Sequence, residues 1–458
     1  MEKRDKKKWL GFLLVLLLIM GSTTSVFHQF TSFPKEMRLV KGQLQQLDLS
    51  MPVSATASVS KPDILQVNGS TQSLVPINLK HPLMIQPQAI GQTFLTLKLF
   101  GSLPIKRVNV QVLPDLQVIP GGQTIGVKLK SSGALVVGHH QVQSNQSVRS
   151  PAEKADIRRG DYLTEMNGMK IKQVSDVART VNDAGRKRLP IQVTLMRDGK
   201  EKQVNVHPVY NSQEDVYQLG LYIRDAAAGV GTLTFYEPQK KAYGALGHVI
   251  TDVDTGQAIS VGDGQILQSD VTSIEKGKSG DPGEKRAIFL NEDQVMGNIS
   301  NNTQFGIFGK MSNFPQGGIQ SQPMPVGLAE QVEEGPAQIY TVVEGQTVKA
   351  YDIEIVHTQI QKSPATKGLI IKVTDPELLA KTGGIVQGMS GSPIIQNGKL
   401  VGAVTHVFVN DPTSGYGTFI EWMLQDAGVL NTSEAEGSFW ESSASEIVIT
   451  CTLPSYPI

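Results

Sequence analysis

The segment 387–393, with the sequence Gln-Gly-Met-Ser-Gly-Ser-Pro, constrains the fold of this chain more than any other stretch. It lies between two β-like runs, and an Asn397-Gly398 hairpin turn follows it closely. Gly388 and Gly391 allow the backbone to fold tightly around Ser390. The main-chain N–H groups of Gly388 and Ser390 can then converge on one point. We therefore expect a tight, serine-bearing turn inside a β structure.

A turn of this kind is how proteases of the chymotrypsin type present their nucleophile, with the two N–H groups forming an oxyanion hole. The strand-turn-helix elbow of α/β-hydrolases is excluded, because Pro393 and a hairpin follow the serine where that fold has a helix. An ordinary Gly/Ser-rich hairpin loop is the alternative interpretation of the same residues.

The composition indicates a turn-rich, mainly β protein. The chain has 458 residues, which is enough for about three domains. Its 45 glycines and 24 prolines stand against an aromatic content of 6%. Its 42 basic and 42 acidic residues cancel, so there is no global attraction to nucleic acid. The single Cys451 excludes an internal disulfide and a cysteine metal cage.

The N-terminus predicts export. Five basic residues, Lys3, Arg4, Lys6, Lys7 and Lys8, precede an apolar run that starts at Trp9 and ends at Met20. This is the pattern of a secretory signal, and extension to Phe27 gives a stretch just long enough to span a bilayer. No Ala-x-Ala cleavage site is evident, so we expect 1–27 to be a signal or uncleaved anchor, with the rest of the chain exported. Residues 28–113 alternate apolar and polar side chains and predict a small β-rich domain without chemistry of its own.

Residues 114–210 resemble a PDZ domain of the kind attached to exported bacterial proteases, most specifically from Ser150 to Gly168. The resemblance implies that Ile125, Gly126 and Val127 form the loop that receives a peptide carboxylate. A peptide would then add as a strand between 127–130 and the helix near Val177. A PDZ fold that only packs against its neighbour is the alternative. His139-His140 is unsuited to a metal, because adjacent residues of a strand point to opposite faces.

Residues 215–432 carry the candidate catalytic groups. His248 follows the small residues Gly244-Ala245-Leu246-Gly247 and precedes Val249-Ile250, which suits a base at the edge of a core. With an ordinary pKa near 6.5, it could take the Ser390 proton at neutral pH. A histidine that only fills the core is the alternative.

The acid of a triad is harder to place. Asp375 ends an apolar strand and precedes Pro376, and the order His248, Asp375, Ser390 is that of chymotrypsin-type chains. Competing carboxylates are Asp252, Asp254 and Asp270. His406, on the strand after the nucleophile, is a reserve base or lines the substrate pocket. No metal or organic cofactor is required for this chemistry.

Together, the signal-like N-terminus, the PDZ-like region and the motifs around His248 and Ser390 resemble the stage IV sporulation protein B serine peptidase family. The resemblance implies a double β-barrel peptidase domain in which His248, Asp375 and Ser390 form the triad and Gly388 and Ser390 the oxyanion hole. It implies a peptidase that cleaves itself and a membrane-bound regulator of an intramembrane protease, triggering processing of the sigma-K precursor during endospore formation. The enzyme would be exported across the forespore membrane into the space between forespore and mother cell, at first membrane-anchored.

Two other functions fit parts of the sequence. A non-catalytic PDZ adaptor in the intermembrane space would explain a peptide groove but not the coexistence of Ser390, His248 and the paired glycines. A secreted hydrolase of esters or glycans lacks the paired-carboxylate cleft that glycosidases need. The Ser- and Glu-rich residues 433–458 predict a C-terminal tail that docks or stays loose.

Overall fold

This computed structural model describes residues 13, 15, 35–47, 54–99, 101, 103–144, 150–290, 295–312, 314–359, 361, 363–430 and 456–457. Its contacts divide the chain into two units, 1–116 and 117–458. The described part of the chain contains no helix long and apolar enough to cross a membrane. Apart from residues 13 and 15, the predicted signal or anchor segment 1–27 lies outside the described residues.

The first unit consists of two small sheets around one core. The five-stranded sheet contains, in spatial order, β1 (Glu36–Val40), β8 (Leu103–Leu113), β7 (Gly91–Leu99), β3 (Ser54–Val59) and β5 (Leu74–Asn78). The three-stranded sheet contains β2 (Gln45–Leu47), β6 (Leu83–Pro87) and β4 (Leu65–Val67). Every second side chain of β3 is buried, which is the pattern of a strand with one face on a core.

The second unit begins with the region that resembles a PDZ domain. Its elements are α3 (Pro151–Lys154), β11 (Tyr162–Met166), β12 (Met169–Lys170), α4 (Val174–Lys187), β13 (Ile191–Arg197), β14 (Lys200–Val206), β15 (Val209–Asn211) and β16 (Val216–Gln218). The helical spacing predicted around Val177 is that of α4, which buries Val177 and Val181 in the core. The β11–β12 turn places Asn167 and Gly168 at positive φ.

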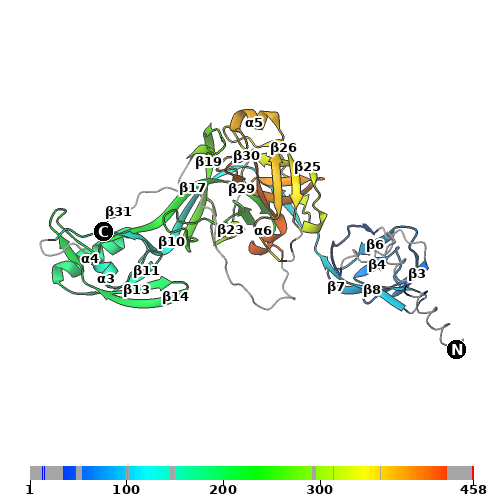
Figure 1. Ribbon diagram of the computed structural model, residues 1–458, viewed down its shortest axis with the longest axis horizontal. Helices are drawn as coiled ribbons and strands as arrows, with labels where there is room; N and C mark the ends of the chain where they lie inside the picture. The colour runs from blue at the N-terminus through cyan, green and yellow to red at the C-terminus, as the bar shows by residue number, and fades with distance from the viewer. Residues whose placement is uncertain are drawn as a thin grey trace. The chain divides into compact units, whose positions relative to one another are not determined.

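Two long strands connect this region to the rest of the unit (Figure 1). The strands β10 (Thr124–His139) and β17 (Leu221–Glu237) pair from Thr124↔Thr232 to His139↔Leu221. On its other edge β10 pairs with β19 (Val261–Glu275). The same large sheet includes β9 (Gln117–Pro120), β18 (Ala242–Ala245), β20 (Glu284–Phe289), β21 (Val295–Asn298), β22 (Asn301–Thr303), β23 (Gly306–Lys310) and β24 (Met324–Pro325).

A closed barrel completes the unit. Its strands, in order, are β25 (Gly335–Thr341), β26 (Lys349–Thr358), β27 (Leu369–Val373), β30 (Asp411–Phe419), β29 (Lys399–Phe408) and β28 (Pro393–Gln396). The first and last strands pair at Ile339↔Ile394, which closes the ring. Three short helices accompany the barrel: η1 (Ala329–Gln331), α5 (Pro376–Thr382) and α6 (Ile420–Asp426).

The prediction of a mainly β protein with a PDZ region is confirmed, but the expected double barrel is closed in only one of its two parts. The part that carries His248 is an open sheet. The physical reason is the length of its strands. Because β10 and β17 continue into the PDZ region and β10 holds β19 on its free edge, these strands do not curl back onto one another.

Candidate active site

Ser390 lies in a tight turn between α5 and β28. The turn is closed by two main-chain hydrogen bonds, from Met389 N to Val386 O at 3.0 Å and from Ser392 N to Met389 O at 2.9 Å. Gly388 and Gly391 adopt φ values of 90° and 92°, which favour glycine. A Cβ at Gly391 would lie 2.2 Å from Thr232 O. The predicted role of the paired glycines is therefore confirmed by the geometry of the turn.

Strand β17 of the open sheet holds the carbonyl groups of this turn. Thr232 N donates to Ser390 O at 3.0 Å, and Thr232 Oγ1 donates to Gly388 O at 2.7 Å. Thr234 Oγ1 donates to Gly391 O at 2.8 Å. Both threonine side chains are fully buried. The open sheet thus fixes the orientation of a turn that belongs, by sequence, to the barrel.

With the carbonyls held, two N–H groups of the turn remain for a ligand. Gln387 O accepts from Lys285 N at 2.9 Å and Met389 O accepts from Ser392 N at 2.9 Å. In a trans peptide the N–H of the next residue points away from the carbonyl. Gly388 N–H and Ser390 N–H therefore point away from those partners, and among the described hydrogen bonds neither has a protein acceptor. This is the arrangement expected of an oxyanion hole.

The structure brings Ser390 and His248 to two adjacent residues of β29, Thr405 and His406. Ser390 Oγ donates to Thr405 O at 2.8 Å. The ring of His248 lies beside that of His406, with 5.1 Å between the centroids. Both His248 and Ser390 are buried, with exposed fractions of 8% and 7%. No described hydrogen bond joins the two side chains to each other.

Burial keeps both histidines of the site neutral near pH 7. It lowers the pKa of His248, although the hydrogen bond with Val249 O acts in the opposite direction. His248 Nδ1 lies 2.8 Å from Val249 O. When Nδ1 carries the proton and donates it to this carbonyl, Nε2 is left as the acceptor that a general base needs. Burial, and then the neighbouring His248 and Lys367, lowers the pKa of His406 to about 4. Its Nδ1 is buried without a hydrogen-bond partner.

The described contacts of Asp375 lie at the start of α5 and do not include His248. Its carboxylate caps α5 by accepting from Leu378 N at 2.9 Å, and it also accepts from Asp352 N at 3.4 Å. An Asp before Pro at the start of a helix is a strong capping signature, and this signature accounts for Asp375 without any role at His248. No described hydrogen bond joins the two residues, so the structure does not support Asp375 as the triad acid.

The competing carboxylates are also engaged away from His248. Asp252 forms an ion pair with Arg224, and Arg224 also contacts Asp254 Oδ2 at 2.7 Å. Asp270 accepts from Gln346 Nε2 at 3.4 Å. In the described structure, the partner of His248 Nδ1 is therefore a main-chain carbonyl.

The predicted carboxylate-binding loop of the PDZ region requires a correction. Ile125, Gly126 and Val127 are not a loop but the middle of β10, paired with β17 on one side and with β19 on the other. Both edges of the strand are occupied, so a peptide cannot add there. Gly126 is required for a different reason, because a Cβ would lie 2.4 Å from the ring of Phe289.

A different strand edge in the PDZ region does receive an extended segment. Strand β31 (Tyr456–Pro457), from the end of the sequence, pairs with β17 at Tyr222↔Pro457 and Ile223↔Tyr456. The helix α4 packs beside this end of β17, and both contribute to the same core. In the described residues, the edge of β17 at Tyr222 and Ile223 therefore pairs with another strand of the same chain.

Sequence reasoning missed four residues of the site. Thr232, Thr234, Thr405 and Lys285 contact the nucleophile turn, residues 387–392, through hydrogen bonds or packing. The alternation Thr232-Leu233-Thr234 is a weak signal of a polar strand face. Nothing in the sequence distinguishes Lys285 from the other lysines.

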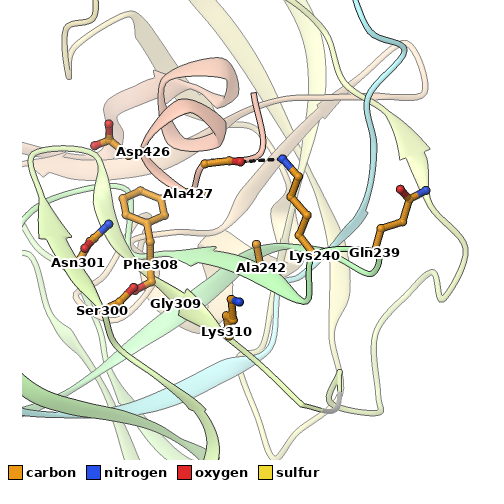
Figure 2. A pocket seen from close by; sticks show the side chains of 11 residues that line it. Gln239, Lys240, Ala242, Ser300, Asn301, Phe308, Gly309, Lys310, Asp426 and Ala427 are labelled. Carbon is orange, nitrogen blue, oxygen red and sulfur yellow. Dashed lines mark hydrogen bonds between the residues drawn. The ribbon is translucent and has the colours of Figure 1, made fainter. Parts of the chain in front are cut away.

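One cavity lies away from the candidate catalytic groups (Figure 2). It has a volume of about 460 Å³ and is bordered by Phe308, Asp426 and Lys240, whose Nζ donates to Gly428 O at 2.8 Å. Neither Ser390 nor His248 lines it. Over the described ranges, no cluster of histidine, cysteine and carboxylate side chains could hold a metal ion.

Known protein families match both regions of the second unit. Residues 215–424 match the family described as SpoIVB peptidase S55. Residues 124–207 match the PDZ domain family. The first match contains His248, Asp375, Ser390 and the whole nucleophile turn.

Two relatives share shorter stretches. A protein of Mesorhizobium japonicum named as a zinc metalloprotease is 33% identical over 120 residues, which are 26% of this chain and 32% of that protein. A DegP-like protein of Rhizobium meliloti named as a periplasmic serine endoprotease is 30% identical over 156 residues, 34% of this chain and 27% of that protein. The matches thus span about a third or less of the length of these relatives.

Solved structures give weaker likenesses. The active form of the Rv3671c protease from M. tuberculosis is 16% identical, with 44% of this chain and 74% of that chain covered and a TM-score of 0.25. The thermostable serine protease AL20 from an extremophilic microorganism is 12% identical, with 45% and 90% covered and a TM-score of 0.27. Neither TM-score is high enough to bear on the fold.

The family matches agree with the geometry of the nucleophile turn and with the PDZ region that precedes it. Residues 215–424 thus match the SpoIVB S55 family of serine peptidases, and a PDZ domain at 124–207 precedes them.

Proposed function

We propose that this protein is an exported serine endopeptidase in which Ser390 is the nucleophile and His248 the general base. The observation that carries the proposal is the pair of N–H groups at Gly388 and Ser390, which lack protein acceptors among the described hydrogen bonds. These N–H groups belong to the turn of the buried Ser390. The buried His248 lies nearby, and its lowered pKa keeps the imidazole neutral. A turn that only links two strands has no need of this arrangement.

In the proposed reaction, Ser390 Oγ leaves Thr405 O by rotation of its side chain and turns toward His248 Nε2. His248 takes the hydroxyl proton as Oγ attacks the scissile carbonyl, and the N–H groups of Gly388 and Ser390 stabilise the oxyanion. The imidazolium then protonates the leaving amine, and a water molecule hydrolyses the acyl-enzyme by the same steps in reverse. Val249 O holds the tautomer of His248 in place of a carboxylate.

The PDZ region would recruit the substrate. We propose that extended peptide segments add to the edge of β17 at Tyr222 and Ile223, beside α4. The pairing of β31 with this edge supports the proposal, because it demonstrates that the backbone groups there accept a strand. A segment of the same chain would then compete with peptides from other proteins.

The match to the SpoIVB peptidase S55 family supports a more specific role. We propose that the enzyme cleaves itself and a membrane-bound regulator of an intramembrane protease, and so triggers sigma-K precursor processing during endospore formation. It would act after export across the forespore membrane, in the space between forespore and mother cell. The basic and apolar residues near the N-terminus support an initial membrane anchor.

The test compares the wild type with Ser390→Ala. The exported part of each is purified, incubated alone and treated with a fluorophosphonate probe. We expect self-cleavage and labelling of the wild type at Ser390, and neither in the variant. If the wild type stays full length and takes up no probe while it still binds extended peptides, the protein is a non-catalytic PDZ adaptor.

A further inference from the structure

A buried lysine lies directly beneath the proposed oxyanion hole. Lys285, on β20, has an exposed fraction of 1%. Its Nζ donates to Thr341 Oγ1 at 2.8 Å, at the end of strand β25 of the barrel. Thr341 is itself fully buried. Neither the catalytic chemistry nor the recruitment of peptides requires this side chain.

Lys285 contacts the nucleophile turn at two points. Its main-chain N–H donates to Gln387 O at 2.9 Å. Its aliphatic stem packs against Gly388, where an added Cβ would lie 3.1 Å from Lys285 Cβ and 3.4 Å from Cγ and Cδ. The peptide between Gln387 and Gly388 supplies one of the two oxyanion N–H groups. Lys285 therefore fixes the carbonyl side of that peptide and supports the Cα of the residue that carries the N–H.

The β19–β20 hairpin brings Lys285 to this place. Gln387 N donates to Gly283 O at 3.0 Å, so both main-chain groups of Gln387 bond to the hairpin. The hairpin also bonds to the end of α5 through Gly277 N and Thr382 O at 2.8 Å. Its other strand, β19, is paired with β10, which continues into the PDZ region. The oxyanion hole is thus supported by a hairpin that belongs to the open sheet.

We propose that Lys285 is a positioning residue that sets the N–H of Gly388 in the oxyanion hole by tying β20 to Thr341 beneath the nucleophile turn. This inference rests on the proposed peptidase function. An unbranched stem fills the space under Gly388, and the amine at its end holds the stem in one place.

The electrostatic state of the amine is consistent with this role. Burial lowers the pKa of Lys285 to about 7, so the neutral amine is readily populated. A buried ammonium with one hydroxyl partner would be costly, whereas a neutral amine that donates to Thr341 is much less so. The side chain therefore acts through its position and its hydrogen bond, and a methionine of similar length keeps the stem while it removes the amine with its hydrogen bond and its charge.

The test measures the rate at which a fluorophosphonate labels Ser390 as a function of probe concentration, in the full chain. In Lys285→Met we expect the limiting rate to fall about 10- to 100-fold, because a misplaced oxyanion donor affects mainly the transition state. The half-saturating probe concentration should stay nearly unchanged. Thr341→Val, which removes the acceptor but keeps the shape, should reproduce the loss. Lys278→Met, on the exposed part of the same hairpin, should label at the wild-type rate.

Stability separates a positioning role from a purely structural one. Replacement of a buried amine by methionine should leave the urea midpoint unchanged or raise it, while the labelling rate falls. Wild-type labelling of Lys285→Met, or a loss of rate that only follows a loss of folded protein, overturns the proposal. Should Lys285→Met not fold, a wild-type rate in Thr341→Val overturns it alone. A wild type that takes up no probe refutes the peptidase function itself, which is a different result.

Discussion

The proposed nucleophile and the proposed base come from two bodies, the closed barrel and the open sheet, that are constructed differently. The barrel that carries Ser390 closes on itself through the pairing of β25 with β28, so its strands have internal partners on both sides. The sheet that carries His248 is open, and its strands β10 and β17 continue into the PDZ region. Closure of the barrel pairs its first strand with its last, whereas the long strands of the open sheet belong to two regions at once.

The open sheet also orients the turn that carries Ser390. Thr232 and Thr234 of β17 hold three carbonyl groups of the nucleophile turn, and the β19–β20 hairpin holds Gln387. The barrel carries Ser390, the proposed nucleophile, whereas the open sheet carries His248, the proposed base, and orients the turn. A peptide that binds to β17 in the PDZ region therefore binds to the same strand that positions Ser390.

The largest expected effect is that of replacing His248, the proposed base. We expect His248→Ala to lower the Ser390-dependent cleavage rate by on the order of 10⁶-fold, as loss of the base does in serine proteases. Cleavage and probe labelling of the folded variant would measure the effect. His357→Ala is the control, because His357 is an exposed histidine of the barrel that pairs with Glu334. A similar loss in both variants would contradict a specific role for His248.

A methyl group added at Gly391 should push the turn that carries Ser390 away from the open sheet. In Gly391→Ala the new Cβ would lie 2.2 Å from Thr232 O and 2.4 Å from Leu246 N, on the open sheet. With the added strain of a positive φ, we expect a loss of ~2–4 kcal/mol in the free energy of unfolding, together with loss of activity. Urea unfolding followed by tryptophan fluorescence would measure it.

Gly398→Ala is a matched control for that change. Gly398 also has a positive φ, of 72°, but a Cβ there has no atom within 4 Å. We expect a loss of only ~1 kcal/mol from backbone strain. Equal losses at the two glycines would indicate that contact between the bodies at Gly391 does not matter.

The nucleophile turn could be predicted from sequence because its signal is local. Two glycines around Ser390 and a following Asn397-Gly398 hairpin are sufficient to define such a turn. The sequence also predicted that His248 and Ser390 share one site, and the structure places them against the adjacent residues His406 and Thr405. The supporting residues were not, since Thr232 and Lys285 lie more than 100 positions from Ser390 and meet it only through the fold.

Two sequence patterns had a second physical explanation that the sequence could not reveal. Ile125-Gly126-Val127 resembles a carboxylate loop, but Gly126 is small because Phe289 packs directly on it. Asp375 resembles a triad acid by its order in the chain, but it caps a helix that the following proline begins. In both cases the decisive contact is made by backbone or by a residue distant in sequence.

Acid should weaken the site gradually, and His406 supplies part of the effect. The folded pKa of His406, about 4, lies below its ordinary value of 6.5. Between these two values the unfolded chain binds more protons than the folded chain. The stability that neutral His406 contributes is therefore fully present above pH 6.5 and is lost as the pH falls toward 4.

Urea unfolding at pH 7 and at pH 4.5 measures this dependence. Relative to the wild type, His406→Gln should lose less stability over that interval, by ~1–3 kcal/mol. Titratable groups remote from His406 behave alike in both proteins and cancel in the difference, which leaves His406 and its coupling to the neighbouring His248. The same loss in both proteins would exclude His406 as the titrating group.

The smallest expected effect is that of replacing Asp375, and it tests whether the barrel supplies the acid of a catalytic triad. Asp375 caps α5 on the barrel side, through Leu378 N at 2.9 Å. We expect Asp375→Ala to cost ~1 kcal/mol in the free energy of unfolding and to leave the rate of cleavage by folded protein within about threefold of the wild type. Asp375→Asn preserves the capping group and should restore the stability. A 10³-fold or larger loss of rate in both variants would instead make Asp375 the triad acid. It would also require the site to rearrange until this carboxylate reaches His248, which would mean that the barrel controls the base as well as the nucleophile.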